Sequence, residues 1–115
     1  MPLNQDGFGL ALNLLTDATD GINKVALLYD ISGGASDNAT ATQTIVWGTA
    51  IPLPGSGYIE MSTDLVFNCS ATWIVIGVLI YHNTTLVGTG TFGGAQYNFT
   101  NAGTFTLTGL RLSLD

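Results

Sequence analysis

The chain has 115 residues, of which 46% are hydrophobic and only 9% charged, and its formal net charge is −6. This length predicts one domain with a sizeable core, and the apolar content excludes an intrinsically disordered segment. Two basic residues, Lys24 and Arg111, cannot neutralise a phosphate backbone, so we expect neither nucleic acid nor an anionic membrane as a partner. The polar surface depends on Thr, Asn, Ser and Gly instead of charge, which favours a protein that lies against neighbours. The alternative is a monomer with a neutral exterior.

The first predicted element is a single helix within residues 2–16, followed by a turn cluster at 16–21. Gly7 and Gly9 each weaken a helix by about 1 kcal/mol relative to alanine, so we expect the helix to begin only near Phe8. Asn4 or Asp6 is a suitable cap. The apolar face at helical spacing comprises Leu3, Phe8, Leu12 and Leu15, broadened by Leu10, Ala11 and Leu14.

The rest of the chain is predicted to form short strands separated by turn signals. A Gly/Ser/Asn-rich surface loop covers residues 32–41, and residues 49–57 hold two prolines, which excludes them from an inner strand. Residues 82–85 predict a tight hairpin connection. The predicted strands are 23–31, 42–48, 58–62, 64–70, 72–82, 85–93, 97–100 and 104–114.

The longest apolar run, residues 72–82, is predicted to be the central strand. It is rich in β-branched and aromatic residues at both parities, so we expect it to be covered on both faces. It is too short to cross a bilayer as a helix, which takes about 20 apolar residues. The last segment changes phase at Gly109, and a period-2 pattern that slips at a glycine predicts a β-bulge at residues 108–110.

These elements predict an all-β fold, an antiparallel β-sandwich of about seven to eight strands, jelly-roll or immunoglobulin-like, with one short N-terminal helix. We divide the chain into an arm and helix at 1–21 and a sandwich domain at 22–115.

Motifs of catalysis are weak, and we expect a non-enzymatic protein without metal or cofactor. His82 is the only histidine, and no serine lies in a nucleophile elbow. The closest approach to a calcium loop, Asp17 to Gly21, lacks most of its ligands. The acids Glu60 and Asp64 flank a turn and make a poor glycosidase pair. Trp47, Trp73, Tyr81 and Tyr97 are candidates for a sugar platform, although aromatic residues at strand parity are more often core.

The cysteine content and the N-terminal residues indicate the cellular compartment in which the chain is made. Cys69 is the only cysteine, so no intramolecular disulfide forms, and its alternation with Phe67 predicts a buried thiol. The start has no positively charged segment of the kind that opens a signal peptide, so we expect synthesis in a cytosol without secretion by the general pathway.

Six motifs follow one another along the chain: GLALNLLTDA at 9–18, VALLYD at 25–30, IVWG at 45–48, LVF at 65–67, IVIGVL at 74–79 and GTFTLTGLRLSL at 103–114. Their order and spacing resemble those of small structural proteins of tailed-bacteriophage virions. The chain departs from that pattern in two places. Residues 42–44 are neutral where the pattern has a basic or aromatic residue, and the aromatic residue near the end of the central strand is Tyr81 instead of tryptophan.

The resemblance implies a virion component without enzymatic activity. Our first hypothesis is a capsid decoration, or cement, protein that binds the outer surface of the phage head as a homotrimer, with the major capsid protein and copies of itself as partners. The second is a minor tail or tail-fibre-associated protein, with loops 32–41 and 93–96 at a recognition tip. The third is a carbohydrate-binding module using Trp47 or Tyr97. The candidate assembly contacts are the apolar residues least obviously used by a sandwich: Leu3, Phe8, Ile51 and Leu53.

Overall fold

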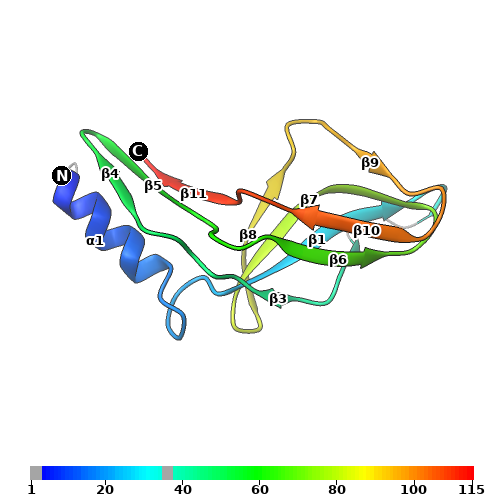
Figure 1. The fold of residues 1–115 in the computed structure, drawn as a ribbon, viewed down its shortest axis with the longest axis horizontal. Coiled ribbons are helices and arrows are strands. Elements are labelled where there is room, and N and C mark those ends of the chain that lie inside the picture. The colour runs from blue at the N-terminus through cyan, green and yellow to red at the C-terminus, as the bar shows by residue number, and fades with distance from the viewer. Residues whose placement is uncertain (1–3, 35–37) are drawn as a thin grey trace.

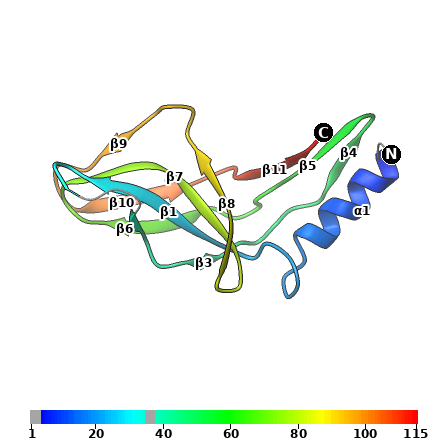
Figure 2. The ribbon, with the colours of Figure 1, turned by 180° about the vertical axis from the view of Figure 1, so that it is seen from behind.

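The computed structural model describes residues 4–34 and 38–115 and shows an elongated molecule measuring 47 × 27 × 22 Å (Figure 1). It consists mostly of antiparallel strands with one short helix, which confirms the predicted all-β class. The helix lies at one end, and the largest sheet extends toward the other (Figures 1 and 2). The elements are α1 (Gln5–Leu15), β1 (Lys24–Ile31), β2 (Asn38–Ala39), β3 (Gln43–Thr44), β4 (Ile51–Leu53), β5 (Ser56–Glu60), β6 (Leu65–Cys69), β7 (Trp73–His82), β8 (Thr85–Thr91), β9 (Tyr97–Asn98), β10 (Gly103–Leu107) and β11 (Arg111–Leu114).

Three antiparallel sheets build the molecule. The main sheet has the order β2-β1-β7-β8, with β3 paired to β1 and β9 paired to β7. The prediction that 72–82 is a central strand is therefore confirmed, because β7 lies between β1 and β8. A two-stranded ribbon, β10-β6, packs over this sheet, and a three-stranded end sheet, β11-β5-β4, carries the helix. The proline-containing strand β4 lies at an edge of the sheet, where proline's missing backbone N–H does not remove a hydrogen bond from an inner ladder.

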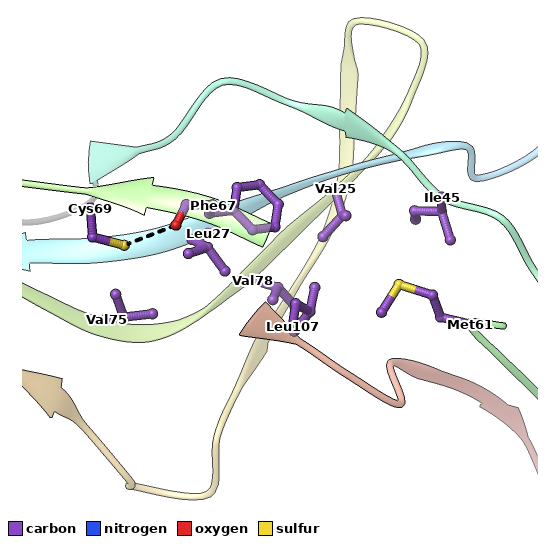
Figure 3. Close-up of a cluster of buried hydrophobic side chains, with 9 residues drawn as sticks. All are labelled: Val25, Leu27, Ile45, Met61, Phe67, Cys69, Val75, Val78 and Leu107. Atoms are coloured by element: carbon purple, nitrogen blue, oxygen red, sulfur yellow. Dashed lines mark hydrogen bonds between the residues drawn. The ribbon is translucent and has the colours of Figure 1, made fainter. Parts of the chain in front are cut away.

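The main core lies between the main sheet and the ribbon, as Figure 3 shows. Val25 and Leu27 of β1 are fully buried, and they meet Phe67 of β6 and Leu107 of β10 across the interface. Because each sheet has one apolar face, stacking the two faces removes both from water. The arrangement is sandwich-like, as the alternating strand pattern predicted.

A β-bulge decides which residues of β7 enter this core. Tyr29 of β1 pairs with Val75, but the preceding Leu28 pairs with Gly77, so Ile76 is an extra residue. The bulge switches the parity of β7, and Val75 and Val78 therefore both belong to the core cluster. On the opposite face Gly77 is buried, while Ile74 and Leu79 are half-buried, so the expectation that both faces are covered is confirmed only in part.

The helix belongs to a second packing unit at the end of the molecule. Leu12 of α1 has no exposed surface, and Phe8 is 5% exposed, because both side chains lie on the end sheet beside Ile59. Gly57 allows this approach, since a Cβ there would lie 3.0 Å from the Cβ of Phe8 and 3.1 Å from Leu12 Cδ1. The helix therefore covers one face of the end sheet.

The helix starts earlier than its glycines suggest. Asn4 is the N-cap, and its side chain accepts a hydrogen bond of 2.8 Å from the backbone N–H of Gly7. Packing of Phe8 and Leu12 on the sheet stabilises the helix more than two glycines weaken it, because tertiary contacts supply most helical stability. The expectation that the helix begins near Phe8 is therefore wrong, and the proposed cap at Asn4 is confirmed.

A buried asparagine ties the segment after the helix to the β7–β8 hairpin. The Asn23 side-chain amide donates to Asn83 Oδ1 at 2.9 Å and to the carbonyl of Ala18 at 3.0 Å. Its carbonyl oxygen accepts from the backbone N–H of Asn83 at 2.8 Å. Asn83 adopts φ +53° in the tight two-residue turn that the sequence predicted. This network sets the position of the helical end relative to the main sheet.

The break near the C-terminus is present, but its form differs from the prediction. β10 and β11 run along β6 and β5, and Gly109 between them adopts φ +62°. Leu107 pairs with Leu65 and Arg111 with Glu60, so residues 108–110 face the longer segment 61–64. The extra residue therefore lies on the opposing strand. This change of register moves the chain from the main core to the end sheet.

The predicted strand at 42–48 forms only in part. β3 covers Gln43 and Thr44, and after it a single isolated bridge joins Trp47 to Met61. Ile45 is buried in the core, while the indole N–H of Trp47 donates to the carbonyl of Ile22 at 2.8 Å. Side-chain packing and separate backbone hydrogen bonds, such as the 2.7 Å bond from the Gly48 N–H to the carbonyl of Glu60, place this segment, where the sequence pattern predicted a continuous ladder.

Candidate functional site: exposed surfaces at the two ends

The outer side of α1 carries two exposed leucines, which we call the helix stripe. Leu10 is 64% exposed and Leu14 is 65% exposed. They lie one helical turn apart and about 200° around the helix axis from the buried pair Phe8 and Leu12. Sequence analysis placed them at the margin of the buried face. Their angular separation from Phe8 was the signal that would have marked them as exposed.

A shallow groove continues from the helix stripe toward the β7–β8 hairpin. Leu14 and Leu15 line one side, and Ile22 and Val87 line the other, around a volume of about 470 Å³. His82 also lines the groove, and its Nδ1 lies 2.8 Å from the carbonyl oxygen of Gly21. We call this the side groove. The only histidine of the sequence thus holds two connecting segments together.

The face of the end sheet opposite the helix is also uncovered, and we call it the bare face. Ile51 pairs with Tyr58, so both side chains project on the same side, away from the helix that Gly57 approaches. Ile51 and Leu53 are exposed. Arg111 lies over the Tyr58 ring at 4.0 Å and forms a 2.9 Å ion pair with Glu60. Apolar side chains and a solvent-exposed ion pair therefore share this surface.

The predicted assembly contacts fall into three groups. Ile51 and Leu53 lie exposed on the bare face, where a partner has access to them. Phe8 is buried between α1 and the end sheet, so the expectation that the domain leaves this residue unused is wrong. Leu3 lies outside the described residues. Contact of any of these residues with a partner stays a prediction.

A larger groove opens between β9 and β10, and we call it the aromatic groove. Its volume is about 630 Å³, and Tyr97, Phe99 and Phe105 contribute to its walls. The ring centroid of Tyr97 lies 5.1 Å from that of Phe105, in an edge-to-face arrangement. The 93–96 loop, which the sequence placed at a recognition tip, borders it through Gln96. The other predicted loop, 32–41, contains residues that the structure does not describe.

The four aromatic residues proposed as a sugar platform do not form one surface. Trp73 stacks on Tyr29 with ring centroids 3.7 Å apart and packs against the core. Trp47 is half-buried and packs against the core beside Ile22, with which its indole is hydrogen-bonded. Tyr97 is 47% exposed in the aromatic groove. Of the candidates for glycan contact, Tyr97 is therefore the better placed.

Two polar features lie apart from these surfaces. Burial raises the pKa of the Cys69 thiol, and a hydrogen bond with the backbone of Phe105 opposes that shift. Asp30 Oδ1 is buried without a hydrogen-bond partner beside a pocket of about 220 Å³ that Thr91 and Gln96 also line. Within residues 4–34 and 38–115, no group of three or more His, Cys, Asp or Glu side chains is arranged to hold a metal ion.

Comparisons with family models, with curated proteins and with solved structures find no match to this chain. The fold and the exposed surfaces thus define a mostly antiparallel, sandwich-like protein with a packed helical end, and the resemblance to phage virion proteins stays a prediction from the motifs. The helix α1 is too short to span a membrane, and the described part of the chain contains no other helix.

Proposed function

We propose that this chain is a non-enzymatic structural subunit of a bacteriophage virion, and specifically a capsid decoration protein that docks on the outer surface of the head. The observation that carries the proposal is the helix stripe, in which Leu10 and Leu14 keep about two thirds of their surface in water. Clustered apolar surface of this kind marks interaction sites on soluble proteins. The low charge content and the motif order support the same assignment.

The mechanism of such a subunit is thermodynamic. A protein that binds only the assembled shell stabilises that shell by mass action, without any chemical step. Burying the exposed parts of Leu10 and Leu14 contributes on the order of 3 kcal/mol per copy. The side groove and the bare face, with Ile51 and Leu53, add surface on either side of the helix. The expected partners are the major capsid protein and copies of this chain in a homotrimer.

The finer fold assignment belongs to the same proposal. We take the main sheet and the ribbon as the two layers of a jelly-roll or immunoglobulin-like sandwich that presents the helical end to the capsid. The opposed core residues of β1, β7, β6 and β10 support a two-layer arrangement. Location on the virion, after synthesis in the host cytoplasm, follows from the proposed function.

The test is docking of a double variant, Leu10→Asp with Leu14→Asp, on particles that lack the wild-type protein. We expect occupancy to fall at least about tenfold, because two charges would have to be buried against an apolar partner surface. The matched control is Asn13→Asp, which adds a charge on an exposed position of the same helix. Normal occupancy of the double variant would refute docking through the helix stripe. Removing residues 1–8 is a poorer test, because it deletes the Asn4 cap and the buried Phe8.

A second candidate function is that of a minor tail or tail-fibre-associated protein. The observation that favours it is the aromatic groove beside the 93–96 loop. The strands β9 and β10 that border the groove lie away from α1 (Figures 1 and 2). Copy number in purified particles, measured by quantitative mass spectrometry, separates the two functions. Several hundred copies indicate decoration, and a dozen or fewer indicate the tail. Absence from particles would contradict both.

A further inference from the structure

The aromatic groove has the size and shape of a ligand site, and its floor rests on the main core through Leu107 and Phe105. Its volume of about 630 Å³ lies within the range of about 300–1,000 Å³ that is usual for ligand sites. Residues 96–99 of β9 and its flanks form one wall, and residues 104–108 of β10 and its flank form the other. Because it is bounded by two neighbouring segments and open to solvent, it suits a chain molecule lying along it better than an enclosed small molecule.

Aromatic rings form the apolar part of the groove. The Phe92 and Phe105 rings are stacked with centroids 5.7 Å apart, and Tyr97 meets both of them edge-to-face. These contacts fix the Tyr97 ring, although 47% of the residue stays exposed. A half-exposed ring that is held in place loses little side-chain entropy when a ligand packs on it.

Polar side chains surround the rings. Gln96 and Asn98 contribute amides and Thr104 and Thr106 contribute hydroxyls, and all four residues are exposed. None of these side chains makes a hydrogen bond with another residue in the described ranges, so each is available to a ligand. The described residues that line the groove include no Asp, Glu, Lys or Arg. The site therefore offers neutral donors and acceptors around an aromatic surface.

We propose that the aromatic groove binds a neutral oligosaccharide. Sugar rings present C–H faces that pack on aromatic side chains and hydroxyl groups that both donate and accept hydrogen bonds, which matches Tyr97 together with Gln96 and Asn98. A phosphorylated or carboxylated ligand would find no cation in the groove. The proposal goes beyond capsid decoration and does not depend on it, because β9 and β10, which border the groove, lie at a distance from α1 (Figure 1).

The competing occupant is an extended peptide added to the edge of β10. In the described part of the chain that strand pairs with β6 alone, with Phe105 opposite Phe67, so its other edge leaves backbone groups free for an added strand. A peptide strand would use these backbone groups but would cover the amides of Gln96 and Asn98 without dedicated partners, which is costly. A saccharide satisfies those amides with its hydroxyls, and we therefore favour it.

The test uses isotope-labelled full-length protein titrated with neutral hexasaccharides of glucose and N-acetylglucosamine while amide shifts are followed by NMR. We expect saturable shifts at residues 96–99 and 104–108 for at least one of these sugars. Tyr97→Ala should weaken that affinity by about tenfold or more, because the stacking surface is lost, whereas Tyr97→Phe should retain it. Val66→Ala, which is equally exposed on β6 but outside the groove, should leave the affinity unchanged.

Each contrary outcome overturns the proposal. Absence of shifts with every neutral hexasaccharide shows that the groove is not a site for this class of ligand. Shifts that survive in Tyr97→Ala, with its fold verified by the amide spectrum, place the sugar elsewhere. If an uncharged β-strand peptide shifts residues 103–107 and no sugar does, the groove is a strand-addition site. None of these results depends on whether the protein is found on phage heads.

Discussion

Two leucines on the same helix provide a direct test of how the helical end is built. Leu12 has no exposed surface, whereas Leu14, two residues later, is 65% exposed. Leu12→Ala removes three buried carbon atoms, worth about 2.4 kcal/mol at about 0.8 kcal/mol each, and leaves a cavity against the end sheet. We expect a total loss of about 3–4 kcal/mol in the free energy of unfolding. Leu14→Ala should change it by less than about 0.5 kcal/mol.

The comparison is controlled within the helix itself. Both substitutions change leucine to alanine within the last turn of α1, which ends at Leu15, so the change in helix propensity is the same small favourable amount. The assay is urea unfolding followed by tryptophan fluorescence and by far-ultraviolet circular dichroism. Equal losses for the two variants would refute the assignment of the buried and exposed faces. A loss seen by circular dichroism but not by fluorescence would show that the helical end unfolds apart from the main core.

Three further predictions concern single positions. Asn23→Ala should lower the free energy of unfolding by about 1–3 kcal/mol in urea titrations, because it leaves the Asn83 backbone N–H unpaired, while Asn13→Ala on the exposed helix surface should have almost no effect. Gly77→Ala should cost more than about 3 kcal/mol in the same assay, since its Cβ would overlap the carbonyl oxygen of Gly90 on β8; a loss under 1 kcal/mol would contradict that close approach. Burial raises the pKa of the Cys69 thiol above its ordinary value of 9.0, so the unfolded chain loses that proton first. The contribution of the thiol to the free energy of unfolding should be intact below pH 9 and should fall as the pH rises above it. Urea unfolding midpoints measured across this range should therefore decline less in Cys69→Ala than in the wild type.

The surfaces that carry the proposals depend on tertiary packing more than on local pattern. Leu10, Leu12 and Leu14 have the same side chain, and only the position of the end sheet decides which of them is covered. Tyr97 and Trp47 were equivalent sugar candidates in the sequence. Packing against the core keeps Trp47 half-buried, with its indole bound to Ile22, whereas Tyr97 stays half-exposed beside Phe105. Packing against segments distant in sequence therefore determines which candidate side chains stay exposed.

The sequence by itself determined the all-β class, the short N-terminal helix with a cap at Asn4 or Asp6, the tight turn after His82 and the break near Gly109. These features follow from local physical chemistry: hydrophobic periodicity, side-chain capping and backbone conformations that favour glycine or asparagine. A bulge at Ile76, by contrast, changes which residues of β7 face the core, and it exists only because β1 pairs across it. Likewise, Phe8 is buried because Gly57, far along the chain, lets the helix approach the end sheet. Register and close approach arise between segments distant in sequence, so only the tertiary structure decides them.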